Sequence, residues 1–136
     1  PANTKLPQRS TQFSAGYDFY APTDIFVPAG GESVLIPLNI KAIMPSDMVL
    51  MLFIRSSLAV KFNLSLVNGV GIIDSDYANN QDNDGNIGVK FRNNGSETII
   101  IREGERCAQG IFVRYCVTSD DEASAVRGGG YGSTGR

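Results

Sequence analysis

A chain of 136 residues, of which 42% are hydrophobic and 19% charged, is long enough for one domain with a real core. The formal net charge of -2 excludes the basic surface that nucleic-acid binding usually requires, so we expect no nucleic-acid partner. The absence of histidine from the sequence excludes every mechanism that uses imidazole as a base, a nucleophile or a zinc ligand.

Strand signals recur along the chain and are separated by turns rich in Gly, Pro and Asn. Strands are expected in DIFVP (24–28), SVLIPLNIKAI (33–43), MVLMLFI (48–54), NIGVKF (86–91), ETIII (97–101) and CAQGIFVRYC (107–116). The alternation in 33–43 is expected to place Val34, Ile36, Leu38 and Ile40 on one face. Many short strands between Gly/Pro turns are typical of a sandwich or barrel, so the predicted fold is all-β.

The segment SSLAVKF (56–62) predicts one short helix, because it lacks strand alternation and contains good helix formers. Its first residues form a candidate anion site. Arg55 follows a hydrophobic strand directly, and Ser56 and Ser57 then open the helix. Backbone N–H groups, serine hydroxyls and a guanidinium together can cradle an anion. A routine N-cap and a solvated charge fit the same pattern, and both alternatives stay open on these residues alone.

The segment NGVGIIDSDY (68–77) holds the second candidate site. Asp74 follows two aliphatic residues, a position where a carboxylate can lie at a pocket edge and act as a general base. A turn acid that caps a strand fits this pattern equally well. Tyr77 offers a flat face either to a ligand ring or to the core.

The polar stretch YANNQDNDGN (77–86) imitates the first half of a calcium-binding loop. The position that should supply a bidentate glutamate is Phe91, however, which argues against calcium. Asn and Asp side chains that bond their own backbone in turns explain the composition better.

The chain closes on RGGGYGSTGR (127–136). Glycines let backbone N–H groups approach a phosphate closely, Arg127 adds a positive charge, and Tyr131 can stack on a base. A disordered tail is the alternative that composition alone favours.

Membrane association is not expected, because the most apolar run has seven residues and a spanning helix needs about 20. No signal peptide is recognisable in the opening PANTKLPQRS. The spacing of Cys107 and Cys116 fits neither a zinc site nor a disulfide framework, which favours small buried thiols in a reducing compartment. These features together predict a cytoplasmic protein.

Five segments, taken in order, resemble the five motifs of the trimeric dUTPase family. They are AGYDFYAP (15–22), RSSLA (55–59), NGVGIIDSDY (68–77), GERCAQGIF (104–112) and RGGGYGSTG (127–135). The resemblance implies one jelly-roll-like or distorted β-barrel domain over 1–126, and a flexible Gly-rich arm over 127–136 that closes over the active site. It also implies a homotrimer with shared active sites. The implied reaction, with Mg²⁺ as cofactor, converts dUTP and water to dUMP and pyrophosphate.

The resemblance implies a role for each residue at a motif position. Asp74 would be the general base that orients the attacking water, and Tyr77 would lie under the deoxyribose and exclude a ribose 2′-hydroxyl. The uracil slot would be formed by Asn68 and by backbone groups at Ile72, Ile73 and Gly88. The phosphate chain would be bound by Arg55, Ser56, Ser57 and Gln109.

Two further roles concern the metal and the arm. Asp18 would support Mg²⁺ through water, with phosphate oxygens as the main direct ligands. Arg127 would reach the γ-phosphate and Tyr131 would cover the uracil, so that the arm acts as a lid that is mobile without substrate. The rest of the triphosphate would be wrapped by Gly132, Ser133 and Thr134.

The chain departs from the family pattern at four points. Tyr131 replaces the usual Phe, and Arg127 precedes it by four residues where five are more common. Ser57 replaces the common Gly of the second motif. Gly85 follows Tyr77 by eight residues where the family usually has two, so residues 78–86 form an insertion beside the uracil slot that could meet a protein partner.

Two other functions fit parts of the pattern. A dCTP deaminase has the same fold and a similar second motif, but it needs a catalytic glutamate on the strand that here reads NIGVKFRNN, which contains no acid. A regulatory, protein-binding member of the family is the other alternative, although Asp74 and the arm are both present.

Overall fold

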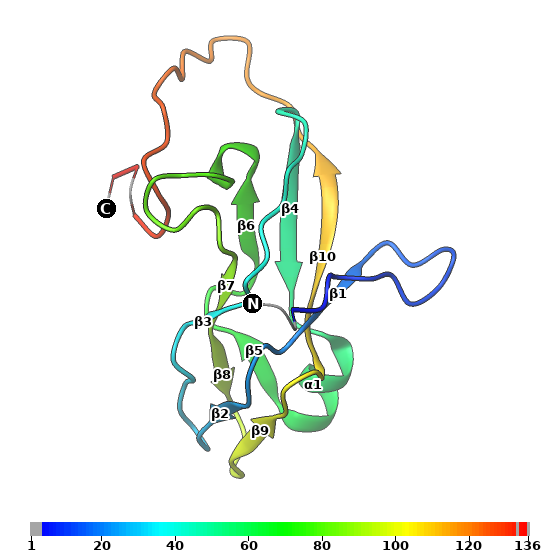
Figure 1. The fold of residues 1–136 in the computed structure, drawn as a ribbon. Coiled ribbons are helices and arrows are strands. Elements are labelled where there is room, and N and C mark those ends of the chain that lie inside the picture. The colour runs from blue at the N-terminus through cyan, green and yellow to red at the C-terminus, as the bar shows by residue number, and fades with distance from the viewer. Residues whose placement is uncertain (1–3, 133, 136) are drawn as a thin grey trace.

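The computed structural model describes residues 4–132, 134 and 135. Short strands make up most of the ordered structure (Figure 1). The elements are β1 (Tyr17–Tyr20), β2 (Ile25–Val27), β3 (Ile36–Pro37), β4 (Met48–Phe53), α1 (Ser56–Phe62), β5 (Leu64–Leu66), β6 (Gly71–Asp74), η1 (Ser75–Tyr77), β7 (Gly88–Val89), β8 (Phe91–Asn93), β9 (Ile99–Ile101) and β10 (Arg106–Arg114). The all-β prediction is therefore confirmed.

The main sheet has four antiparallel strands in the order β1-β10-β4-β6. The long strand β10 lies between β1 and β4, and its Gly110 lets side chains of both neighbours pack closely against it. A Cβ atom on Gly110 would lie 2.9 Å from the Phe19 ring and 3.0 Å from Leu50. Gln109 stands opposite Asp18 on one side and Phe53 on the other, so this sheet brings three separate motifs together.

Three two-stranded ladders complete the architecture, namely β2–β9, β3–β7 and β5–β8. They lie at one end of the long strands β4 and β10, together with α1 (Figure 1). Within the described residues the strands form these separate ladders instead of one closed barrel. The core lies between the ladders and the main sheet, with Phe91, Leu38, Leu52 and Ile101 among its fully buried side chains.

The helix α1 spans the residues that the sequence predicted. Arg55 precedes it in an extended conformation, Leu58 is its buried residue, and Asn63 ends it in the left-handed region, where Asn is tolerated. Among the described helices none is long and apolar enough to cross a membrane.

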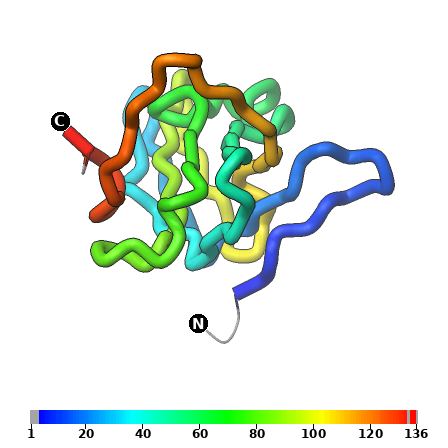
Figure 2. The backbone as a smooth tube through the Cα atoms, turned by 90° about the horizontal axis from the view of Figure 1, so that it is seen from above, coloured from blue at the N-terminus to red at the C-terminus, as the bar shows by residue number. Residues whose placement is uncertain are grey.

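The C-terminal segment leaves β10 and returns across the molecule. Residues 115–126 arc over the end of the main sheet, and the arm from Arg127 then lies beside the loop that follows η1 (Figures 1 and 2). A Cβ on Gly129 would lie 3.0 Å from Asp82, and one on Gly130 would lie 2.6 Å from the Tyr77 ring. Glycine therefore permits the close approach of the arm at both positions.

Two details of the sequence analysis were wrong. Val34 is 74% exposed, although Ile36 and Leu38 are buried as expected. Ser33 faces inward instead, because its hydroxyl accepts a hydrogen bond from the Phe91 N–H at 3.0 Å, and the alternation is interrupted there. Cys107 is buried, but Cys116 lies beyond the end of β10 and is exposed.

Candidate active site

One group of predicted site residues surrounds a polar pocket of about 310 Å³. The first and fourth motifs are neighbours in the sheet, and the second follows directly from the end of β4. The residues that line the pocket are Ser10, Ser14, Ala15, Gly16, Asp18, Arg55, Ser56, Gln109 and Ile111. We call this group the phosphate-side cluster.

Asp18 is the buried acid of the phosphate-side cluster. Its carboxylate lies 3.3 Å from Arg55 Nε and 3.8 Å from Arg106 Nη1. Burial of a charge is costly unless it is paired, and the two guanidinium groups supply that pairing. Arg55 also donates from Nη1 to the Ser57 hydroxyl at 3.2 Å, so its side chain is held at the pocket and is not a freely solvated charge.

Gln109 is placed by its neighbours in the sheet. Its Nε2 donates to the Ile54 carbonyl at 3.4 Å, and a Cβ atom on Gly16 would lie 2.7 Å from its Oε1. Gly16 therefore makes room for the amide beside Arg55. The cluster offers one guanidinium, hydroxyl groups and an amide to a ligand, which is a suitable set for phosphate oxygens.

The second group lies on and beside β6 and β7, and we call it the base-side cluster. Its members are Asn68, Ile72, Ile73, Asp74, Tyr77 and Gly88. Asp74 ends β6 opposite Val49 of β4, and its side chain is 51% exposed. Ile72 is exposed on the same strand, whereas Ile73 packs partly against the core. The carboxylate is thus open to water while its backbone is fixed by the sheet.

Tyr77 is 6% exposed and is the last residue of the 3-10 turn η1, which directly follows Asp74. Its hydroxyl donates to the Asn86 carbonyl at 2.8 Å and accepts a hydrogen bond from Asn83 Nδ2 at 2.7 Å. The ring therefore packs in the core and has a fixed orientation.

A small apolar pocket of about 190 Å³ lies beside β7. Asn68 and Gly88 line it together with Tyr131 of the arm. A Cβ on Gly88 would lie 2.5 Å from the Tyr131 hydroxyl oxygen, so the hydroxyl approaches the backbone of β7 closely. Tyr131 as a whole is 66% exposed, while its hydroxyl lies against the backbone of β7. Desolvation of the hydroxyl, followed by the influence of the neighbouring Tyr77 hydroxyl, raises the pKa of Tyr131 to about 12.

The arm also reaches the acidic residues beside η1. Arg127 Nη2 lies 2.5 Å from Asp74 Oδ2, and its Nε lies 2.7 Å from Asp76 Oδ1. The side chain of Arg127 is 16% exposed. Gly132 and Thr134 follow on the surface, and Ser133 lies outside the described residues. Mobility of the arm without substrate stays a prediction.

The two clusters occupy opposite ends of β4. Asp74 pairs with Val49 near the start of the strand, and Arg55 lies two residues beyond the strand's last residue, Phe53. Six residues of extended chain between positions 49 and 55 span roughly 20 Å. A general base must lie within about 3 Å of the proton it takes. Within one chain, therefore, Asp74 and the phosphate-side cluster do not reach the same phosphorus atom.

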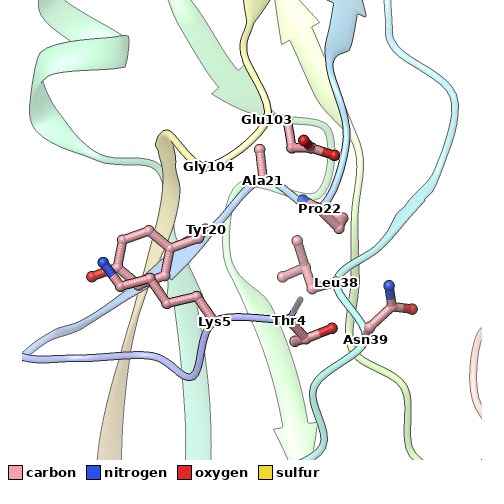
Figure 3. Close-up of a pocket in the computed structure, with 9 residues that line it drawn as sticks. All are labelled: Thr4, Lys5, Tyr20, Ala21, Pro22, Leu38, Asn39, Glu103 and Gly104. Atoms are coloured by element: carbon pink, nitrogen blue, oxygen red, sulfur yellow. The ribbon is translucent and has the colours of Figure 1, made fainter. Parts of the chain in front are cut away.

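A larger hollow of about 450 Å³ lies elsewhere and contains none of the predicted site residues (Figure 3). Lys5 and Tyr20 line one side, with Lys5 Nζ 4.2 Å from the centre of the Tyr20 ring. Leu38 and Asn39 line the other side.

Sequence reasoning missed several residues at the two clusters. Arg106 pairs with Asp18, Ser10 and Ser14 line the phosphate-side pocket, and Asn83 holds Tyr77. Arg106 stands opposite Tyr20 in the ladder, two positions from Asp18, and that register had no signal in the sequence. Asn83 belongs to a stretch whose composition indicated a turn but not its contact.

Comparison with known proteins identifies the family to which the chain belongs. The family model described as dUTPase matches residues 2–135. The chain belongs to the dUTPase family. It is 44% identical to the deoxyuridine 5′-triphosphate nucleotidohydrolase of Lactococcus lactis, with 98% of this chain and 90% of that relative covered. The enzyme of the same name from Solanum lycopersicum is 35% identical, with coverage of 98% and 76%.

Solved dUTPase structures share the fold. The dUTPase from Streptococcus mutans superposes with a TM-score of 0.78 at 40% identity, covering 84% of this chain and 88% of that one. The dUTPase from phage phi11 of S. aureus gives a TM-score of 0.76 at 20% identity and covers 92% of each chain. The second likeness supports the fold alone.

Proposed function

We propose that this protein hydrolyses dUTP to dUMP and pyrophosphate, with Asp74 as the general base. The observation that carries the proposal is the arrangement of the dUTPase motifs as two complementary half-sites. One offers a guanidinium, hydroxyl groups and an amide, and the other offers a half-exposed carboxylate at the end of β6 and a small pocket with Gly88 in its wall. Phosphoryl transfer depends mainly on positioning and charge neutralisation, which these residue types can supply without histidine.

The chemical step begins with a water molecule held by Asp74. Its oxygen attacks the α-phosphorus while its proton passes to the Asp74 carboxylate. The bond from the α-phosphorus to the bridging oxygen breaks, and pyrophosphate leaves. Ser56 would bond this bridging region, and Arg55, Ser57 and Gln109 would neutralise and orient the phosphate chain.

Selection of uracil is assigned to the base-side cluster. Asn68 and backbone groups at Ile72, Ile73 and Gly88 would pair with the edge of the base. Cytosine replaces a carbonyl by an amino group and would leave a buried polar group unpaired, at a cost of about 1–3 kcal/mol. The methyl group of thymine would meet packed backbone. Tyr77 would lie under the deoxyribose and leave no room for a 2′-hydroxyl.

Mg²⁺ is the proposed cofactor, and the donor set fits a role through the substrate. Among the described residues no three His, Cys, Asp or Glu side chains gather as a metal cage. Mg²⁺ characteristically keeps several waters and binds through substrate phosphates and one or two carboxylates. Asp18, at the edge of the phosphate-side pocket, would accept hydrogen bonds from those waters. The metal would supply charge neutralisation on the triphosphate.

A homotrimer with shared active sites is part of the proposal. The support is the distance of roughly 20 Å that β4 imposes between the two clusters of one chain. A second copy that brings its phosphate-side cluster to the Asp74 of the first would complete the site. A symmetric ring of three copies repeats that contact three times and closes.

The arm would act as a lid. Arg127 would reach the γ-phosphate, Tyr131 would cover the uracil, and Gly132, Ser133 and Thr134 would wrap the triphosphate. Closure would exclude water other than the attacking molecule. In a bacterial cell this activity would be cytoplasmic, where it would limit uracil incorporation into DNA and supply dUMP for dTMP synthesis.

A dCTP deaminase fits this site less well. The small apolar pocket beside β7 is lined by aliphatic residues, glycines, Asn68, Lys90 and Tyr131, so among the described residues its lining supplies no carboxylate for deamination. The test is parallel incubation with dUTP, dCTP, dTTP and UTP, with pyrophosphate and ammonia measured. Pyrophosphate from dUTP in large excess over the other three is expected. Ammonia from dCTP, or no turnover of dUTP, would refute the proposal.

A further inference from the structure

The 78–86 loop, which the family pattern does not contain at this length, is held together by its own amide side chains. Asn80 is 8% exposed and uses all four of its hydrogen-bonding positions. Its Nδ2 donates to the Tyr77 carbonyl at 2.7 Å and to Asn83 Oδ1 at 2.8 Å. Its Oδ1 accepts from the N–H groups of Asp82 and Asn83 at 2.9 and 3.0 Å.

Asn83 connects this hydrogen-bonded loop to the hydroxyl group of Tyr77. Its Oδ1 is fixed by Asn80 Nδ2 and by the Gly85 N–H at 3.0 Å, which leaves Nδ2 directed at the Tyr77 hydroxyl. That hydroxyl in turn donates to the Asn86 carbonyl. The loop therefore holds the Tyr77 hydroxyl by two hydrogen bonds, one from the Asn83 amide and one to the Asn86 carbonyl.

The backbone of the loop packs closely against itself at Gly85. Gly85 has a φ of +86°, and a Cβ there would lie 2.6 Å from the Cα of Ala78. The outer side of the loop has a separate anchor, because Lys41 Nζ donates to Asn79 and lies 3.2 Å from the Asp84 carboxylate. This outer anchor does not involve the Tyr77 hydroxyl.

We propose that Asn83 is a positioning residue that sets the discrimination between dUTP and UTP by fixing the ring of Tyr77. This inference rests on the proposed function, in which the ring excludes the 2′-hydroxyl of a ribose. The Tyr77 ring can reject UTP by steric contact only if the 2′-hydroxyl cannot push the ring aside. A ring held at its hydroxyl from two sides yields less to one additional oxygen than a ring held by packing alone.

The test compares kcat/KM for dUTP and for UTP in the wild type and in Asn83→Asp. The substitution keeps an oxygen for Asn80 and Gly85 but replaces the donor to Tyr77 by an acceptor. We expect the ratio of the two kcat/KM values to fall about five- to tenfold, the worth of one hydrogen bond, mainly through a gain in UTP turnover. Lys41→Met removes the outer anchor and serves as the matched control, with an unchanged ratio.

A double-mutant cycle separates positioning from a general effect on the loop. In a Tyr77→Phe background the hydroxyl is gone, so adding Asn83→Asp should change the dUTP/UTP ratio no further. Asn83→Ala provides a second variant if Asn83→Asp does not fold. An unchanged ratio in a folded Asn83 variant, or additive effects in the cycle, would overturn the inference. Absence of dUTP turnover in the wild type would refute the proposed function instead.

Discussion

Arg127 Nη2 lies 2.5 Å from Asp74 Oδ2, so the C-terminal arm places a cation on the carboxylate assigned as the general base. Asp76 accepts a second bond from the same guanidinium at 2.7 Å. In the proposed reaction Arg127 reaches the γ-phosphate, which requires it to exchange these carboxylates for phosphate oxygens. The same exchange would free the Asp74 oxygen for the attacking water. Closure of the arm and exposure of the base are therefore coupled in this account.

Replacement of Asp74 by Asn should abolish hydrolysis and largely spare dUTP binding. The amide cannot accept the water's proton, and a positioned general base contributes about 10²–10⁴-fold to a rate. Pyrophosphate release and calorimetric dUTP binding are the two measurements. Turnover close to that of the wild type would eliminate Asp74 as the base.

Truncation after Val126 should leave a folded protein with a severe loss of activity. The described strands end at Arg114, before the arm begins, so the melting temperature without nucleotide should hardly change. Loss of Arg127, a charge-stabilising group, should lower kcat by about 10²–10³-fold. An unfolded truncation product would indicate a structural arm, and a fully active one would contradict the lid.

Substitutions at Tyr131 should separate its ring from its hydroxyl. Tyr131→Phe keeps the stacking face and should be mild. Tyr131→Ala should weaken dUTP binding tenfold or more, because base–aromatic stacking contributes about 1–3 kcal/mol. Comparison of KM for dUTP in the two variants is the measurement, and equal effects would show that the stacking role is wrong.

Titration of Tyr131 tests its position against Gly88. Burial of the hydroxyl raises the pKa of Tyr131 from 10.0 to about 12, so docking is fully favoured below pH 10 and is lost as the pH rises through about 12. Phenolate absorbance is recorded against pH, without nucleotide, for the wild type and for Tyr131→Phe. The difference between the two titration curves reports the ionisation of Tyr131. A midpoint near 12 would show that the arm is docked without nucleotide and would contradict its predicted mobility, whereas a midpoint near the ordinary value would show that the arm is undocked.

The sequence predicted local features well because their causes are local. SSLAVKF folds as the expected helix from Ser56 to Phe62, since its pattern and the left-handed Asn63 that ends it lie within a few residues. Strands β2, β4, β9 and β10 lie within the expected segments or, for β10, one residue outside. The interruption at Ser33 was not predictable, because it depends on a hydrogen bond to Phe91, distant in the chain.

The resemblance predicted the set of site residues and a site shared between copies, but not which residues one chain brings together. The five motifs assigned Asp74, Arg55 and Gln109 to the same kind of site. The ladder register of β4 nevertheless places Asp74 far from the other two residues within one chain. Register depends on pairing between distant segments, which a single sequence does not display. The ion pair of Arg106 with Asp18 and the hydrogen bond from Asn83 to Tyr77 were missed because they too depend on how the folded chain places these residues.

The most direct test of the central claim, dUTP hydrolysis at a site divided between copies, is complementation between two inactive variants. Asp74→Asn removes the base, and Ser56→Asp places a negative charge where the triphosphate should bind, at a helix start that tolerates an acid. The two are dissociated, mixed in equal amounts and reassembled, with light scattering to verify trimers and each variant alone as a control. If a site takes Asp74 from one copy and Ser56 from another, random mixing predicts about one quarter of wild-type pyrophosphate release from dUTP. Mixed trimers as inactive as the separate variants would contradict the account.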